Sequence, residues 1–346
     1  MTRVSRLVTI ISVATLTSFA TLTVRAEDPA VEQNRRLGRG INLGNALEAP
    51  QEGDWGIILE ESYFEAIQRA GFDSVRIPIR WSNHAARTAP YTIDPAFFDR
   101  VDWAIHQAVS RGLQTVINFH HFEELYENPE AERTRFLGLW KQVAERYRNL
   151  PGSVVFEILN EPHGNLDAER WNTLLVEALG VIRASNPDRI VIVGPASWNN
   201  FRALETLQLP EDDRRLIVTF HYYDPFPFTH QGAEWVENSD PWLGTSWNGS
   251  NTERAEVTSA FDQVATWATE HHRPIVLGEF GAYSKADLAS RARWTAFIAR
   301  QAERRGFSWA YWEFGSGFGA FDPQQGRWRP ELLRALVPTS RSGNRP

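Results

Sequence analysis

The chain of 346 residues contains no cysteine, which excludes disulfide bonds and a lipid attached to a cysteine side chain. It also lacks a linker rich in proline, serine and threonine that would separate two folded parts. A net positive charge is missing as well: the formal charge is −7, whereas a nucleic-acid partner normally requires a basic face that displaces counterions. The fold must therefore rely on its own core, and a neutral polymer fits the charge better than a nucleic acid.

What remains is the composition of a globular protein rich in aromatic side chains. Hydrophobic residues make up 42% of the chain and charged residues 23%, which supplies enough apolar material for a substantial core. Fourteen Trp, twenty Phe and eight Tyr are present, and the tryptophans recur after apolar, strand-like runs. We expect about half of them, including Trp103, Trp140 and Trp267 on helical periodicity, to lie in the core. We expect the other tryptophans to lie at a binding site, because such rings can stack on sugar faces.

The first 26 residues have the pattern of a secretory signal peptide. Two arginines precede the uncharged run Leu7–Val24, and the small residue Ala26 marks the predicted cleavage site. A run of about 18 residues is also just long enough to remain as a membrane anchor, although its repeated Thr and Ser disfavour that alternative. We expect a mature protein that is secreted to the periplasm or the medium and has no membrane contact. Residues 339–346 lack apolar side chains and are predicted to be disordered.

Between these ends, short β-rich runs alternate with longer helical patterns, which indicates a parallel sheet built from βα units. The predicted strands are Gly40–Gly44, Ser74–Ile79, Thr115–His120, Val154–Leu159, Arg189–Gly194, Leu216–Tyr222, Pro274–Phe280 and Phe307–Trp312. Helical periodicity covers Glu60–Ala70, Pro95–Arg111, Glu132–Arg148, Ala168–Ser185, Glu253–His271 and Lys285–Arg305, whereas the fifth connection is short and poorly helical. Eight strands predict a single (β/α)8 TIM barrel, with residues 27–338 as one catalytic domain.

Three glycines lie between predicted helices and the strands that follow them. Gly71, Gly112 and Gly306 each follow a helical segment shortly before the next strand. We expect them to adopt the left-handed conformation that ends many helices.

The most informative residues are two glutamates that follow apolar runs. Glu161 follows Asn160 directly after the fourth predicted strand, and Glu279 lies one residue before the end of the seventh. In a barrel of this kind, the carboxyl ends of the strands gather at the functional face. Cleavage of a glycosidic bond needs two flanking carboxyl groups, one protonated and one ionised. The pair therefore predicts a glycosidase, although either glutamate alone would more simply cap a loop or pair with an arginine.

Several segments, taken together, carry a resemblance to a known family. They are residues 39–48, 75–78, 118–121, 160–162, 221–223, 278–280 and 311–313. Their order and spacing resemble glycoside hydrolase family 5, whose retaining barrel enzymes carry two glutamates at the ends of strands four and seven. Residues 40–55 and 221–235 resemble more narrowly the branch of endo-β-1,4-glucanases that also act on mannans.

The resemblance implies a role for each matching residue. Glu161 would be the general acid and then the base, Glu279 the nucleophile, and Asn160 the group that holds the sugar 2-hydroxyl. Glu161 must be protonated near neutral pH, so we expect a poorly solvated place that raises its pKa. Glu279 needs the reverse, and Arg76 with Tyr223 would keep it ionised. The alternative for Arg76 is a structural salt bridge inside the barrel.

The same resemblance places two histidines, His120 and His221, in the active site. A zinc set of His120, His121, His221 and Glu161 is the rival interpretation. Adjacent residues on a strand point to opposite sides, so His120 and His121 could not bind one ion without a bend. We therefore expect no metal and no other cofactor.

Further residues are expected to contact substrate. Trp312, at the end of the eighth strand, would form the sugar platform where the intermediate is held. Contacts in neighbouring subsites are expected from Asn45, Glu48, His121, His230 and Trp235. For His230 and Trp235, ordinary loop packing is the alternative. We interpret Glu157 as a buried partner in the barrel interior and Glu313 as a loop or supporting group.

The resemblance thus implies a secreted, retaining endo-β-1,4-glucanase that cleaves internal bonds of cellulose or mixed-linkage β-glucan. An endo-β-1,4-mannanase, a dual enzyme that also accepts glucomannan, and a xyloglucanase stay open as alternatives. A non-catalytic carbohydrate-binding barrel is the alternative from a different class, and the presence of both glutamates with Arg76, Asn160 and Tyr223 argues against it. We expect a monomer, because the cleft must stay open to a long polymer.

Overall fold

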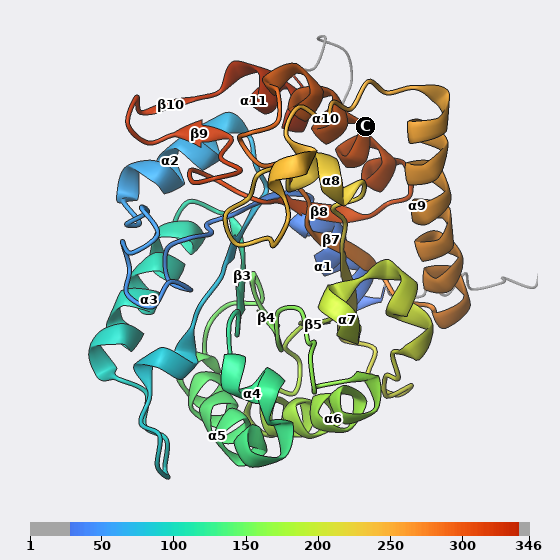
Figure 1. Cartoon of the computed structure of the whole chain (residues 1–346). Helices are drawn as coiled ribbons and strands as arrows, with labels where there is room; N and C mark the ends of the chain where they lie inside the picture. The colour runs from blue at the N-terminus through green and yellow to red at the C-terminus, as the bar shows by residue number, and fades with distance from the viewer. Residues whose placement is uncertain (1–27, 339–346) are drawn as a thin grey trace, which may run out of the picture.

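A closed barrel of eight parallel strands forms the centre of the molecule (Figure 1). The computed structural model describes residues 28–338. Each strand pairs with the next one in the sequence, and β8 pairs with β1 to close the ring. The predicted (β/α)8 fold is confirmed, whereas the predicted signal peptide at 1–26 and tail at 339–346 lie outside the described residues.

All eight strands overlap runs predicted from the sequence. They are β1 (Arg39–Asn42), β2 (Ser74–Ile77), β3 (Gln114–Asn118), β4 (Val154–Glu157), β5 (Val191–Val193), β6 (Leu216–His221), β7 (Ile275–Glu279) and β8 (Ser308–Tyr311). Every strand ends one or two residues earlier than predicted. The third predicted strand, for example, extends to His120, whereas β3 ends at Asn118 and His120 already belongs to a loop. The strand-end side chains are thereby freed from the alternation of the sheet.

The long helices match the predicted helical patterns. They are α2 (Glu61–Ala70), α3 (Pro95–Val109), α5 (Pro129–Tyr147), α6 (Ala168–Ser185), α9 (Asn251–His271) and α10 (Leu288–Arg304). The fifth connection contains the short α7 (Ala196–Asn199) and the 3-10 helix η2 (Phe201–Thr206), in agreement with its weak helical pattern. The sequence patterns missed α1 (Pro29–Leu37), η1 (Trp81–His84), α4 (Glu123–Glu127), α8 (Phe226–Thr229), η3 (Asp240–Trp242), β9 (Phe321–Asp322), β10 (Arg327–Trp328) and α11 (Pro330–Leu336). These elements are too short to give a strong periodic signal.

Local sequence signals fix where several helices begin and end. The Ser250 side chain and Glu253 form a reciprocal capping box at the start of α9, which satisfies backbone N–H groups that the helix leaves free. Gly71, Gly112 and Gly306 have φ angles of 87°, 76° and 73°. The predicted left-handed glycines are confirmed.

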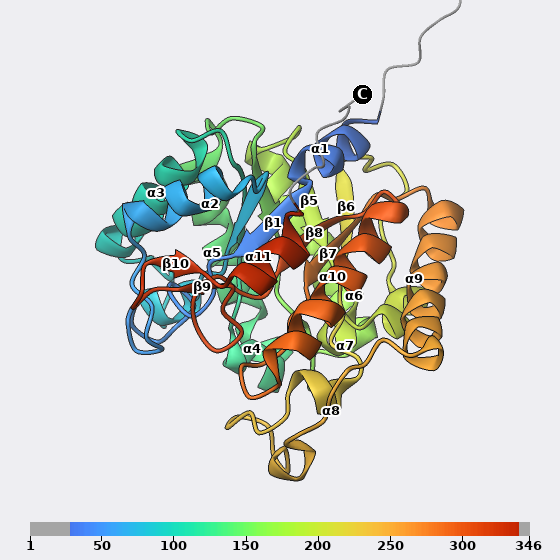
Figure 2. The same ribbon diagram turned by 90° about the horizontal axis from the view of Figure 1, so that it is seen from above.

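The first helix closes one end of the barrel. Ala30 and Leu37 of α1 are buried in one cluster with Val116, Val155 and Ile217, which belong to β3, β4 and β6. Figure 2 shows α1 at the end of the barrel opposite to α4, α7 and α8. Because α1 fills the amino end of the strands with apolar side chains, the carboxyl end is left for polar groups.

The tryptophans divide between the core and the barrel mouth. Trp140 and Trp267 are buried and Trp103 packs half-buried against the core, as predicted from their helical periodicity. Three others are exposed and line the mouth of the barrel: Trp55 (39%), Trp198 (56%) and Trp235 (60%). Large apolar rings held in water at one face indicate a binding surface.

Candidate active site

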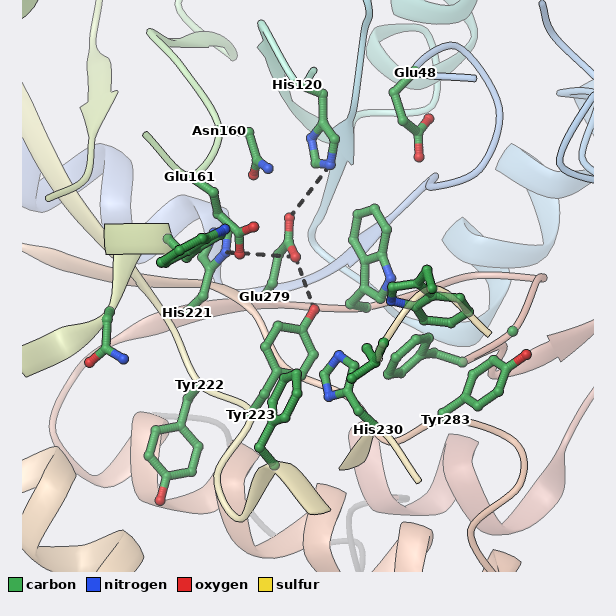
Figure 3. Close-up of a pocket in the computed structure, with 18 of the residues that line it drawn as sticks. Glu48, His120, Asn160, Glu161, His221, Tyr222, Tyr223, His230, Glu279 and Tyr283 are labelled. Carbon is green, nitrogen blue, oxygen red and sulfur yellow. Dashed lines mark hydrogen bonds and ion pairs between the residues drawn. The ribbon is translucent and has the colours of Figure 1, made fainter. Parts of the chain in front are cut away.

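A cleft of about 940 Å³ lies at the carboxyl end of the strands. The residues predicted for the site that line it are Asn45, Glu48, His120, His121, Asn160, Glu161, His221, Tyr223, His230, Trp235, Glu279 and Trp312. The remaining predicted residue, Arg76, is buried and hydrogen-bonded to Asn160 and Glu279. Figure 3 shows Glu161, His221 and Glu279 converging on one point.

We call Asn42, Arg76, Glu157, Asn160 and Glu279 the floor of this cleft. Arg76 Nε and Nη2 donate to the two carboxylate oxygens of Glu157 at 2.6 and 2.9 Å. Arg76 Nη1 donates to Glu279 Oε1 at 2.7 Å and to Asn42 Oδ1 at 2.9 Å, and Nη2 donates to Asn160 Oδ1 at 2.7 Å. Arg76 thus makes both the structural salt bridge of the alternative interpretation and the expected contact with Glu279. Glu157 is the buried partner that the sequence predicts.

The two glutamates face each other above this floor. Glu279 Oε2 accepts a hydrogen bond from the Tyr223 hydroxyl at 2.9 Å, and His120 Nε2 lies 4.0 Å from Glu279 Oε1 (Figure 3). His221 Nδ1 lies 2.6 Å from Glu161 Oε1 and 3.6 Å from Glu279 Oε2. One oxygen of Glu161 and one of Glu279 are within 4.8 Å of each other. Both carboxyl groups can therefore reach one bond placed between them.

Burial raises the pKa of both carboxyl groups. Loss of water raises the pKa of Glu161 to about 7, against the opposing effect of Arg76, although 23% of the Glu161 side chain stays open to solvent. Burial also raises the pKa of Glu279, while His221, Arg76 and the Tyr223 hydroxyl lower it. The expectation of opposite environments is therefore wrong in one respect, because both side chains are poorly solvated. What separates them is hydrogen bonding: Glu279 has the direct bonds to Arg76 and Tyr223, and Glu161 does not.

The backbone at Glu161 is held in an uncommon conformation. Its φ angle is 47°, in the left-handed region that residues other than glycine rarely occupy. The Tyr126 hydroxyl donates to the carbonyl of Asn160 at 2.7 Å, and His163 Nδ1 lies 2.6 Å from the carbonyl of Glu161. Contacts on both sides thus fix the turn that points the Glu161 carboxyl into the cleft.

His120 and His121 do not follow the expected alternation. Both come after the end of β3, their ring centroids are 4.7 Å apart, and both line the cleft. The prediction that they point to opposite sides is wrong, because the chain has already left the strand. The His120 ring stacks on Trp312 at 5.4 Å with an interplanar angle of 6°, and Asn118 Nδ2 lies 3.1 Å from its Nδ1.

The residues that could bind a metal ion are also not the set of His120, His121, His221 and Glu161 that the sequence suggested. Among residues 28–338, Glu161, His221 and Glu279 bring potential ligand atoms within 4.8 Å of one another. Those atoms are already engaged: Glu279 bonds Arg76 and Tyr223, and His221 Nδ1 bonds Glu161. A cation bound there would have to break these contacts, so the donor set fits a hydrogen-bonded carboxyl pair better than an ion.

Two further buried carboxyl groups organise loops beside the cleft. Glu48 accepts backbone N–H groups of Asn45 and Ala46, and burial raises its pKa to about 8. Glu313 is completely buried and accepts N–H groups from the loop that it precedes, including that of Phe318 at 3.1 Å. Burial raises the pKa of Glu313 to about 7. Glu313 thus holds a loop, in line with its predicted supporting place.

A family model described as Cellulase (glycosyl hydrolase family 5) matches residues 39–317. This chain belongs to glycosyl hydrolase family 5. It is 43% identical over 298 residues to Endoglucanase H of Acetivibrio thermocellus, a match that covers 86% of this chain and 31% of that protein. The chain spans about a third of the length of this relative and of the cellulase/esterase CelE of the same organism, which it matches at 28% identity over 83% of its own length.

Solved structures of Thermotoga maritima Cel5A are similar over their whole length. A complex with cellobiose has 53% sequence identity and a TM-score of 0.88, and covers 89% of this chain and 100% of that one. A complex of the same protein with mannotriose gives the same identity, coverage and TM-score.

The family 5 cleft also has aromatic walls, part of which the sequence did not reveal. We call Trp55, Trp198 and Trp235 the rim of the cleft. Trp235 and His230 were expected at the site, and His230 stacks on Phe226 at 4.0 Å while lining the cleft, so it does both of the things that the sequence left open. Lining residues that the sequence did not assign include Trp55, Ser197, Trp198, Asn200, Phe226, Tyr283 and Phe318. They lie in the loops and short helices that follow the strands, and an aromatic residue shortly after a predicted strand end was the sequence feature that could have indicated them.

Proposed function

We propose that this family 5 chain is an endo-β-1,4-glucanase that hydrolyses internal bonds of cellulose or mixed-linkage β-glucan with retention. The observation that carries the proposal is the facing pair of Glu279, held by Arg76 and Tyr223, and Glu161, whose pKa is raised to about 7. Similarity to Endoglucanase H and to a Cel5A structure with cellobiose supports the glucan substrate.

In the first step, a Glu279 oxygen attacks the anomeric carbon while Glu161 gives its proton to the departing glycosidic oxygen. The C–O bond to the leaving sugar breaks, and a glycosyl ester forms on Glu279. In the second step, Glu161, now ionised, takes a proton from water as the water oxygen attacks the same carbon. The ester bond breaks, and both carboxyl groups return to their starting protonation states.

The separation of the two carboxyl groups supports retention. An inverting enzyme needs room for water beside the sugar and holds its carboxyl groups roughly 6.5–9.5 Å apart, whereas retaining pairs lie about 5–5.5 Å apart. One oxygen of Glu161 and one of Glu279 lie within 4.8 Å of each other, which fits the closer spacing of a retaining pair.

The other predicted residues take supporting roles in this proposal. Asn160 accepts from Arg76 through Oδ1, which turns its NH₂ group toward the substrate side as a donor for the sugar 2-hydroxyl. Trp312, stacked on His120, offers its ring as the platform for the sugar that becomes attached to Glu279. Asn45, Glu48, His121, His230 and Trp235 would contact neighbouring sugars.

Mannan is a second substrate that one observation favours. Thermotoga maritima Cel5A, which is 53% identical to this chain, has been solved with mannotriose as well as with cellobiose. Mannose carries an axial 2-hydroxyl, so Asn160 would have to accept both geometries at one position. We propose activity on glucomannan as an addition to glucan cleavage, and a xyloglucanase stays a further candidate.

We also propose secretion of a monomer with residues 27–338 as one catalytic domain. The signal-peptide pattern at residues 1–26 supports secretion. Within the described part of the chain, no helix has the length and apolar character needed to cross a membrane. A monomer would leave the cleft accessible to a long polymer.

The test is release of reducing ends from carboxymethyl cellulose, barley β-glucan and glucomannan by the protein that starts at Glu27. The Glu279→Gln variant is assayed beside it, and proton NMR follows the anomer that forms first. We expect cleavage that yields the β-anomer and that the variant loses. A first product with the α-anomer would overturn retention, and a folded wild type inactive on all three polymers would overturn the function.

A further inference from the structure

Three consecutive residues after β5 adopt the left-handed conformation. Ser197, Trp198 and Asn199 have φ angles of 60°, 60° and 53°, and none of them is a glycine. Such residues cost free energy and persist where the surrounding structure holds them, so they cluster at functional sites. The turn separates its side chains: 56% of Trp198 is exposed in the cleft, whereas Asn199 is completely buried.

The buried amide of Asn199 lies against His221. Asn199 Nδ2 is 3.4 Å from His221 Nε2, the ring nitrogen on the far side from Glu161. Two glycines make room for this contact. A Cβ atom at Gly194 would lie 2.3 Å from Asn199 Oδ1, and one at Gly278 would lie 3.0 Å from His221 Nε2.

The two ring nitrogens of His221 therefore have different partners. A neutral imidazole carries a proton on one nitrogen and accepts a hydrogen bond at the other. In the structure the NH₂ group of Asn199 faces His221 Nε2 and can only donate, so a neutral His221 accepts a hydrogen bond at Nε2 and carries its proton on Nδ1. His221 Nδ1 is 2.6 Å from Glu161 Oε1 and 3.6 Å from Glu279 Oε2.

We propose that Asn199 is a positioning residue that fixes the tautomer of His221 in which Nδ1 donates a hydrogen bond to Glu161. The inference rests on the proposed function, in which Glu161 gives up its proton as the glycosidic bond breaks. The bond from His221 Nδ1 stabilises the negative charge that then develops on Glu161. Without a donor at Nε2, the His221 proton can move to that nitrogen, and Nδ1 would turn a lone pair toward the new carboxylate.

Several charged groups face His221 and set the direction of a pH effect. They are Glu161 and Glu279 at the distances above, with Arg76, Glu157 and His120 acting from farther away. An aspartate at position 199 would accept a hydrogen bond from an Nε2–H group and so favour the doubly protonated ring. A positive His221 beside Glu161 would hold Glu161 ionised and lower its pKa.

The experiment compares Asn199→Asp and Asn199→Leu with the wild type on two aryl β-cellobiosides. One has a leaving group that needs protonation, and the other has an activated leaving group that departs without it. For Asn199→Leu, we expect kcat/KM to fall about tenfold on the first substrate and less than threefold on the second, because acid assistance is what is lost. For Asn199→Asp, we expect the basic limb of the pH profile to move down by about one pH unit.

Asn128→Asp is the matched control for the change from amide to acid. Asn128 caps α5 through its side-chain oxygen, a bond that aspartate keeps, and it is not among the residues lining the cleft. Its profile should overlay that of the wild type. Thermal unfolding of each variant checks that it folds. If Asn199→Leu does not fold, the pH profile of the nearly isosteric Asn199→Asp variant alone tests the tautomer assignment.

The outcomes separate this inference from the proposed function. A wild type that cleaves neither cellobioside nor any β-glucan defeats the function itself. An active wild type whose two Asn199 variants keep its leaving-group dependence and pH profile defeats the tautomer assignment alone. If kcat/KM falls equally on both substrates and the pH profile does not move, the role of Asn199 is purely structural, which also overturns the inference.

Discussion

The floor and the rim of the cleft are built in opposite ways. On the floor, Arg76 and Glu157 are 3% and 1% exposed, and one guanidinium bonds four other side chains. On the rim, Trp55, Trp198 and Trp235 keep 39–60% of their surface in water. A change on the floor alters several bonds at once, whereas each rim ring can be changed alone. We therefore expect the floor to control kcat and the rim to control KM.

Arg76→Met should have the largest effect, because it removes the charge that both Glu157 and Glu279 need. Breaking a buried ion pair on one side typically costs about 3–5 kcal/mol of stability. We expect kcat to fall roughly 10³-fold, near the upper range for the loss of one preorganised donor. Urea unfolding and initial rates on β-glucan measure the two effects. Activity within tenfold of the wild type would show that the floor residues do not depend on Arg76 for catalysis.

Between floor and rim, Glu161 should set the alkaline limit of activity. It must be protonated to act as an acid, and its pKa is raised to about 7. The log of kcat/KM should therefore fall with unit slope above about pH 7, tenfold for each pH unit. A profile on β-glucan from pH 4 to pH 10 measures it. A flat profile to pH 9 would contradict the assignment of Glu161 as the acid.

Trp198→Ala should have a smaller effect than Arg76→Met, and it should change KM and not kcat. Losing one aromatic platform of about 0.5–1.5 kcal/mol raises KM roughly 2- to 12-fold while kcat stays within twofold. Val176→Ala is the matched control, because Val176 is 50% exposed on α6 and is not a lining residue of the cleft. A large fall in kcat with unchanged KM would place Trp198 with the floor.

The smallest effect concerns stability. Because the pKa of Glu161 is higher in the folded chain than its ordinary value of 4.5, the folded state binds more protons, and stability falls as pH rises from about 4.5 to 7. Glu161→Gln removes this penalty, so its Tm should match the wild type near pH 4 and exceed it by about 2–4 °C at pH 8. The exposed Glu256→Gln change is the control. A variant with lower Tm at pH 8 would contradict this account.

The sequence predicted the barrel and its strand-end polar residues because both follow from local pattern. An apolar run followed by Asn160 and Glu161 can be recognised in the sequence without knowledge of any contact. The bonds of Arg76 to Glu157 and Glu279 join residues 81 and 203 positions apart, and only the closed ring brings them together.

The loops were less predictable for a different reason. His120 and His121 share the cleft because β3 ends two residues earlier than the pattern suggests. Asn199 was not predicted from the sequence, because its role depends on contact with His221, which lies 22 positions later in the chain. The poor solvation of Glu279 likewise depends on neighbours from several strands.

The position of His221 between the two glutamates has a consequence for how charge moves during the proposed reaction. Before cleavage, the charges of Glu157, Arg76 and Glu279 sum to −1, and Glu161 is neutral. Once the ester forms, Glu279 is neutral and Glu161 carries the charge, so the sum is unchanged. One unit of charge has crossed less than 5 Å, past a ring nitrogen 2.6 Å from Glu161 and 3.6 Å from Glu279. Since the substrate is uncharged and the cleft keeps its net charge throughout, turnover on β-glucan should respond little to ionic strength.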